Sequence, residues 1–265
     1  MQVINKKMLY GNENAFVLYE YQRELKLLKQ LINISEQAIA QCKVKDLWSY
    51  GGVCHAFAQT ILDYSKAAYD NLVLGHFHAV NMISRSVLEN LVCLDTIISY
   101  QEHELWKYYL AHSCYKSLCT SKRELDVSQR EEVYGFCRRL DLPEEYYIRG
   151  KTKPYIECDY GWIYKINSAK KLSFRRLCEM YEDNAEYHGF RMMSEYSHGT
   201  SYFLKMDSSI SVDHMMFMII NIYISIYRMV MIYLPDGIDT NFDNIAMELE
   251  SIFYGHIQYQ ERWKR

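Results

Sequence analysis

The sequence is poor in the residues that form tight turns, with only 11 Gly and 3 Pro in 265 residues. Folds built from many short strands need such turns, so the shortage argues against a β-sandwich or β-barrel. No P-loop and no GxGxxG motif is present, which removes the usual motifs for ATP and dinucleotides. The sequence also lacks a GxSxG motif and a CxxC pair, so it carries no common signature of a serine hydrolase or a dithiol centre.

The chain has little net charge, −3 from 30 basic and 33 acidic residues. This balance argues against tight binding of duplex nucleic acid, and it leaves room for brief contact with one RNA at a local site. Eight scattered cysteines, several at apolar positions of helical patterns, and no signal peptide in the first seven residues favour a reduced, cytoplasmic protein. The 25 Tyr predict polar contacts inside the core or an interface, because a buried tyrosine hydroxyl needs a partner.

Apolar residues recur at helical spacing along most of the chain and predict an all-α fold. Gly51-Gly52 is expected to separate the first two helices, and residues 141–158, with three Gly or Pro, to form a loop insertion. From Asp159 a helical pattern resumes. The expected helices are 12–43, 53–73, 76–100, 102–121, 128–140, a segment capped by Ser211 that ends before Pro235, and 241–262.

These elements predict one helical domain over residues 1–265, a mostly antiparallel bundle of about seven to nine helices. Its N-terminal helix is 12–43, its core 53–235 and its C-terminal helix 241–262. The apolar run Met215 to Leu234 is long enough for a membrane span, but a central arginine costs about 2.5–3.5 kcal/mol there. We therefore expect a buried core helix, with a membrane span or a membrane-surface helix as the alternatives.

The best candidate site is the segment from Phe190 to His198. On a helix Arg191 and His198, seven residues apart, point within roughly 20° of each other, with Ser194 between them on that face. A cation, a hydroxyl and an imidazole together suit the handling of a phosphate. The structural alternative is that His198 stabilises the end of the helix and Arg191 pairs with Glu195.

A second polar group lies on the predicted helix 76–100, where His78, Asn81, Arg85 and Glu89 form an edge beside the apolar stripe. One interpretation is a solvated face with an ion pair. The other is that Arg85 and Glu89 are partly buried and orient groups on the helix that carries His198. No metal or cofactor is expected, since the histidine and cysteine spacings do not suit chelation.

Both groups resemble motifs of a bacterial all-α family of unknown function. That family carries an Arg-Ser-x-x-Glu element, here Arg85 to Glu89, and a later Phe-Arg-x-x-Ser-x-x-x-His element, here Phe190 to His198, after an aromatic-rich segment that starts near Trp162. The resemblance covers about residues 55 to 235. Arg191-x6-His198 is also similar to the R-x4–6-H motif of the HEPN superfamily of helical bundles.

The HEPN resemblance implies a metal-independent ribonuclease of a defence or toxin–antitoxin system. It further implies a homodimer in which Arg191 and His198 act on RNA across the interface, with an antitoxin or defence protein as partner. In this hypothesis Ser194 orients a catalytic group, and Arg85, Glu89 and His78 form a supporting shell. Active members carry Asn, Asp or His directly after the arginine, where this chain has Met192. The alternative is a non-catalytic interaction or sensor protein with a buried Arg/Glu/His network.

Overall fold

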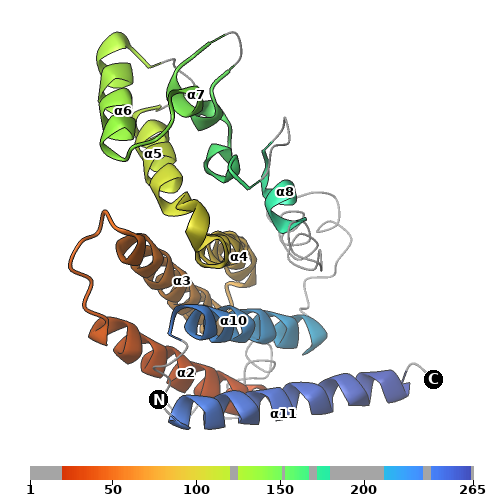
Figure 1. The fold of residues 1–265 in the computed structure, drawn as a ribbon. Coiled ribbons are helices and arrows are strands. Elements are labelled where there is room, and N and C mark those ends of the chain that lie inside the picture. The colour runs from red at the N-terminus through yellow and green to blue at the C-terminus, as the bar shows by residue number, and fades with distance from the viewer. Residues whose placement is uncertain are drawn as a thin grey trace. The chain divides into compact units, whose positions relative to one another are not determined.

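The structure is a computed structural model that describes residues 20–119, 125–150, 153–166, 172–179, 212–234 and 240–263. Within these ranges it has nine α-helices, three short 3-10 helices and no strand (Figure 1), which confirms the all-α bundle. The α-helices are α2 (Gln22–Gln41), α3 (Tyr50–Val73), α4 (Phe77–Ser99), α5 (Leu105–Leu118), α6 (Val127–Arg139), α7 (Glu144–Tyr147), α8 (Phe174–Cys178), α10 (Val212–Tyr233) and α11 (Thr240–Trp263). The 3-10 helices are η2 (Gln101–His103), η4 (Tyr155–Glu157) and η5 (Gly161–Ile163).

The chain forms two compact units, and the boundary between them falls within α3 and α4. The single-domain organisation stays a prediction. Unit 1 comprises Met1–Lys43, Ala58–Leu91 and His188–Arg265, and unit 2 comprises Val44–Phe57 and Val92–Tyr187.

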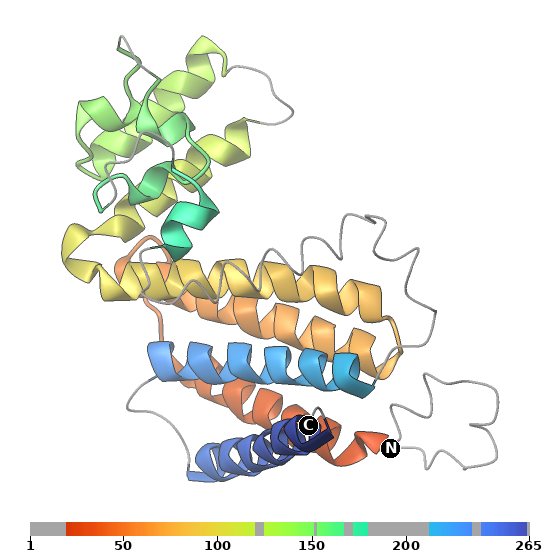
Figure 2. The same cartoon turned by 90° about the vertical axis from the view of Figure 1, so that its right-hand side faces the viewer.

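Unit 1 is built around α2, which lies against both α10 and α11. The last two helices run antiparallel in Figure 2, as expected for neighbours joined by a short connection. Leu28, Leu31 and Ile32 of α2 are fully buried, at 0% exposure, in accordance with the predicted apolar spacing. The packed face of α2 therefore supplies much of the core of this unit.

Polar contacts hold the helices of unit 1 in register. The guanidinium of Arg23 on α2 lies 2.7 Å from the Glu248 carboxylate on α11. The hydroxyl of Tyr223 on α10 donates to Glu250 on α11 at 2.7 Å. Tyr223 is 4% exposed, so this bond keeps a buried phenol satisfied. It is one of the tyrosine contacts that the composition predicts.

The α10 helix is mostly buried on one face, as the core-helix prediction requires. Ten residues from Met215 to Val230 are buried, whereas Ile224 and Met231 are 42% and 41% exposed. Of the helices in the described ranges, α10 alone is long and apolar enough to cross a membrane, and half of that stretch is buried. Length and composition do not distinguish a buried core helix from a membrane span, so the assignment of α10 as a core helix rests on the burial of its side chains.

Unit 2 is organised around α5, which lies against α6, η4 and η5. Trp162 of η5 is 2% exposed, and its ring meets Tyr109 of α5 edge-on, with centroids 5.6 Å apart. The hydroxyl of Tyr146, on α7, is buried and donates to the carbonyl oxygen of Tyr108 at 3.1 Å. Tyrosines thus carry both the apolar area and the polar contacts of this core.

The expected break at Gly51-Gly52 is wrong, because both residues belong to the first turn of α3. The hydroxyl oxygen of Ser49 accepts a hydrogen bond from the backbone N–H of Gly52 at 3.1 Å, which starts the helix. A Cβ on Gly52 would lie 2.4 Å from the carbonyl oxygen of Asp46. Gly52 is therefore needed because the preceding backbone passes too close for a side chain, and it does not interrupt the helix.

Residues 141–158 are also more structured than a plain loop insertion. They contain α7 and η4, and Tyr146 within them is fully buried. The helical pattern expected after Asp159 appears as two short elements, η5 and α8. At Gly161 an added Cβ would lie 1.8 Å from the carbonyl oxygen of Tyr155, so η5 is seated directly on η4. Among the described residues this packing, which no local pattern reveals, gives a short 3-10 helix near the start of the expected helical pattern.

Candidate functional site

The α4 helix carries the three predicted supporting residues in a regular helical arrangement. Arg85 and Glu89 are half-buried and lie one turn apart on the same side, whereas His78 is exposed. Between them Asn81 is 4% exposed. The polar edge of α4 is thus a partly buried surface rather than a fully solvated face, which is the condition that a supporting role for Arg85 and Glu89 requires.

The proposed catalytic residues Arg191, Ser194 and His198 lie outside the described residues. Their helix, their mutual distances and their contact with α4 therefore stay predictions. The same holds for Ser211, the expected cap of α10, and for the first eight residues of the predicted helix 12–43.

The buried cysteines are poorly suited to nucleophilic catalysis. Burial raises the pKa of the Cys54 thiol to about 11 and that of Cys137 to about 12. A thiol with such a pKa is almost entirely protonated near neutral pH, and the thiolate is the reactive form. All eight cysteines are free thiols, four of them buried, and they act as small apolar residues.

His112 on α5 is a buried histidine with a structural contact. It is 7% exposed, and its Nε2 lies 2.8 Å from the carbonyl oxygen of Cys158. Because a carbonyl can only accept, Nε2 carries the hydrogen and donates it. The pKa of His112 is lowered to about 4, mainly by burial and to a smaller extent by the nearby Lys116, while the hydrogen bond to the Cys158 carbonyl and the charge of Asp159 act in the opposite direction. The neutral imidazole therefore links α5 to the segment before η5.

This contact predicts a loss of stability in acid. The unfolded chain binds a proton near pH 6.5 and the folded chain near pH 4, so His112 favours folding fully above pH 6.5 and progressively less as pH falls to 4. The loss is at most about 3 kcal/mol, at 1.36 kcal/mol per pKa unit. Urea titrations at both pH values should show a smaller loss in His112→Gln than in wild type. An equal loss in both proteins would contradict the assignment, and His103→Gln, at an exposed histidine, is the control.

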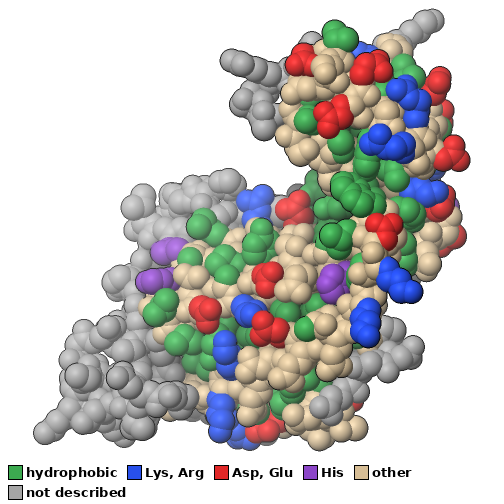
Figure 3. Space-filling model, turned by 90° about the vertical axis from the view of Figure 1, so that its left-hand side faces the viewer, with side chains coloured by type: hydrophobic (Ala, Val, Ile, Leu, Met, Phe, Trp, Pro, Cys, Tyr) green, Lys and Arg blue, Asp and Glu red, His purple; other side chains and the backbone are tan. Residues whose placement is uncertain are grey.

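The surface shows charges of both signs intermixed. On the face drawn in Figure 3, basic and acidic side chains alternate among apolar and uncharged ones, with no broad basic area. This agrees with the small net charge of the sequence. Any contact with RNA on this face would be local rather than an extended electrostatic track.

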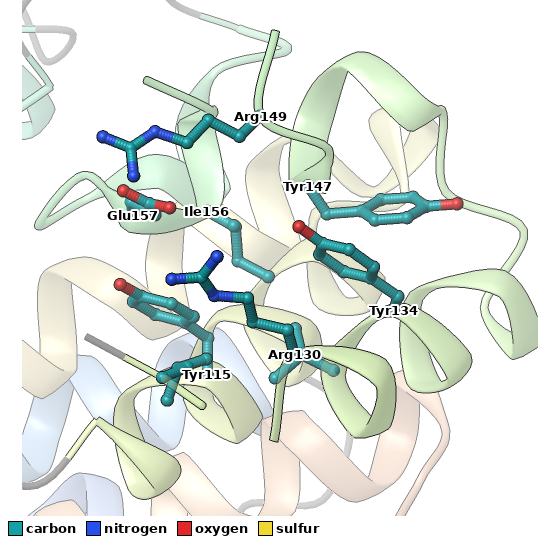
Figure 4. A pocket seen from close by; sticks show the side chains of 9 residues that line it. Tyr115, Arg130, Tyr134, Tyr147, Arg149, Ile156 and Glu157 are labelled. Carbon is teal, nitrogen blue, oxygen red and sulfur yellow. The ribbon is translucent and has the colours of Figure 1, made fainter. Parts of the chain in front are cut away.

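A pocket in unit 2 gathers charged and aromatic side chains that the sequence reasoning did not single out. It has a volume of about 50 Å³ and lies between α5, α6, α7 and η4. Figure 4 shows the guanidinium of Arg130 reaching into it beside the Tyr115 ring, and Arg149 beside Glu157. The lining residues are Tyr115, Leu125, Arg130, Val133, Tyr134, Tyr147, Arg149, Ile156 and Glu157.

The pocket residues come from four separate elements, so no sequence motif marks them. Tyr115 and Glu157 are 42 residues apart and converge because η4 lies against α5. The only local signal is the run of Tyr and Arg around residues 146 to 149, directly after Pro143. Residues 141–158, which the sequence pattern predicts to be a loop insertion, thus contribute several of the residues that line the pocket.

A family model described as a family of unknown function (DUF5677) matches residues 52–213 of the chain. This region contains both the Arg85-to-Glu89 element and the Arg191-to-His198 element. No curated protein and no solved structure matches the chain.

Proposed function

We propose that this chain, which belongs to the DUF5677 family of unknown function, is a HEPN-like ribonuclease that cleaves RNA without a metal ion, in a defence or toxin–antitoxin system. The observation that carries the proposal is the pairing of two elements within the family region. Arg85 and Glu89 stand half-buried on α4, and Arg191 and His198 follow at the spacing of the HEPN motif.

In this mechanism His198 acts as the general acid–base group. It takes the proton from a ribose 2′-hydroxyl, and the 2′ oxygen attacks the adjacent phosphorus. Arg191 stabilises the pentacoordinate phosphate, where negative charge builds up. The bond from phosphorus to the 5′ oxygen breaks, and that oxygen is protonated. The products are a 2′,3′-cyclic phosphate and a 5′-hydroxyl end.

The remaining site residues position these two groups. Ser194 lies between them on the predicted helix face and orients one of them. Arg85 and Glu89 supply a charged shell, with His78 at its exposed end. The substrate is RNA, the working unit is a homodimer, and an antitoxin or defence protein restrains the enzyme in the cytoplasm.

The ends of the products test this chemistry. Purified protein in excess EDTA is expected to cut RNA and to leave the DNA of the same sequence intact, because DNA has no 2′-hydroxyl. The RNA products should carry 2′,3′-cyclic phosphate and 5′-hydroxyl ends. Cleavage that needs a divalent ion and leaves 3′-hydroxyl ends would contradict the mechanism.

A second function is favoured by the burial on α4. Asn81 and Ser84 are 4% and 7% exposed next to the half-buried Arg85 and Glu89, so this polar edge is packed. A packed polar network fixes helix register and suits a non-catalytic interaction or sensor protein. If Arg85→Gln lowers stability while the wild type cuts no RNA, this function replaces the ribonuclease.

A further inference from the structure

We infer that the Arg130 pocket of unit 2 binds a terminal phosphate group, either as inorganic phosphate or as part of a nucleoside 5′-monophosphate. The proposal is independent of the ribonuclease mechanism, since none of the catalytic or supporting residues lines this pocket. It rests on the charge, the hydrogen-bond donors and the size of the pocket.

The charge of the lining favours an anion. Arg130 and Arg149 provide two guanidinium groups against the single carboxylate of Glu157. A guanidinium has five N–H donors in a planar fork, so it can keep a protein partner and still donate to two phosphate oxygens. Figure 4 shows Arg130 with its fork directed into the pocket, on the side of the Tyr115 ring and below the side chains of Arg149 and Glu157.

Tyr115 adds a neutral donor. Burial, followed by its hydrogen bond with Cys119, raises its pKa above the usual range, so the hydroxyl keeps its hydrogen at neutral pH. The Cys119 sulfur lies 3.8 Å from the phenol oxygen, a weak contact. The hydroxyl can rotate and donate its hydrogen to a phosphate oxygen instead.

The size of the pocket limits the ligand to a small head group. A volume of about 50 Å³ has room for a few water-sized groups and not for a whole nucleotide. Val133 and Ile156, each 1% exposed, add buried apolar side chains to the lining. The pocket is partly open, so the rest of a nucleotide can extend outward from it. Tyr134, whose ring packs against Tyr147 with centroids 5.4 Å apart, is the lining aromatic residue on which a base would stack.

Glu157 works against anion binding and gives the proposal a sharp test. In Figure 4 its carboxylate lies beside Arg149, which offsets part of its charge. The negative charge of Glu157 that Arg149 does not offset repels a phosphate and lowers the affinity of the pocket for it. Glu157→Gln is therefore expected to bind phosphate several-fold more tightly than wild type. A pocket built for a cationic ligand would show the opposite change.

The experiment is calorimetric titration of the full chain with inorganic phosphate, adenosine 5′-monophosphate and adenosine at constant ionic strength. Wild type should bind both phosphate probes and not adenosine. Arg130→Gln should weaken this binding at least tenfold, about the effect of losing a charge-assisted hydrogen bond. Arg138→Gln is the matched control: this exposed arginine on the same helix pairs with Glu131 at 3.5 Å and does not line the pocket.

Four results would overturn the proposal. The first is that wild type binds neither phosphate probe at a concentration of about 10 mM, which corresponds to a binding free energy of only about −3 kcal/mol. The second is that adenosine binds as tightly as the phosphate probes. The third is that Arg130→Gln and Arg138→Gln lose the same affinity for phosphate, and the fourth is that Glu157→Gln binds phosphate more weakly than wild type. Circular dichroism checks the fold of each variant. If Arg130→Gln does not fold, Arg130→Lys, which keeps the charge and loses the fork, should bind more weakly than wild type, and unchanged binding there would also refute the site. Tighter binding of the nucleotide than of phosphate would add base stacking to phosphate recognition.

Discussion

Replacing His198 with Ala is expected to lower the rate of RNA cleavage by about a hundredfold to ten-thousandfold, the usual contribution of a general acid–base group. In the proposed reaction the His198 imidazole is the group that takes up and returns the proton near neutral pH. Alanine leaves Arg191 in place, so RNA binding should persist while turnover is lost. The measurement is the single-turnover cleavage rate of a labelled RNA by purified protein.

A matched histidine separates catalysis from general damage. His103 lies in η2, its side chain is 43% exposed, and its Nε2 lies 3.5 Å from the Glu102 carboxylate. His103→Ala should cleave RNA at the wild-type rate. If His198→Ala keeps the wild-type rate, or if both variants lose activity equally, His198 is not the catalytic base. Helix content by circular dichroism should be the same in all three proteins.

Replacing Trp162 with Ala is expected to destabilise the protein by about 3–5 kcal/mol, the range for deleting a fully buried large side chain. Trp162 is 2% exposed and meets Tyr109 edge-on. Its neighbour Gly161 is fixed against the Tyr155 backbone, so η5 cannot shift to fill the space. The cavity therefore persists, and its full cost appears in the free energy of unfolding.

Urea unfolding followed by circular dichroism at 222 nm measures this loss without depending on tryptophan emission. Trp48→Ala is the control, because Trp48 is 61% exposed and touches only the edge of one ring that is described, Phe136. Its loss should cost about 1 kcal/mol at most. A Trp162→Ala protein as stable as Trp48→Ala would show that η5 is not part of the core.

The helices of this chain could be predicted where one apolar face repeats over several turns. In α2 and α4 most of the expected residues that the structure describes are buried, including Leu28, Leu31, Val80 and Leu94 at 0% exposure, whereas Ile83, Leu88 and Ile98 are half-buried. The helical spacing of the apolar residues matches the buried positions in these two helices, because each helix packs one apolar face against a core. The boundaries of α4, 76–100 expected and Phe77–Ser99 observed, agree within one residue.

Prediction failed where a close contact, and not a periodic pattern, decides the local structure. The local pattern marks Gly52 as a helix breaker, yet the glycine is needed because the backbone of Asp46 and Leu47, just before α3, passes within reach of its Cβ position. Tyr146 lies in a segment marked as a loop by Pro143 and Gly150, yet its burial against α5 turns that segment into part of the core. Neither contact leaves a trace in nearby sequence.

Candidate residues could likewise be predicted where they lie on one helix, and not where they come from several elements. Spacing on one helix was enough to select Arg85 and Glu89, because residues four apart share a face. The pocket around Arg130 was missed, since Tyr115, Arg130 and Glu157 come from different elements and meet only in the folded unit.

The most direct test of the ribonuclease proposal is RNA sequencing of new 5′-hydroxyl ends in cells that express the chain. Wild type is expected to slow growth and to produce new ends at defined sites. Cells with Arg191→Ala or His198→Ala should grow like the empty-vector control and show no such ends. If wild type leaves the RNA ends unchanged, or if the two variants produce the same ends as wild type, the chain is not the ribonuclease proposed here.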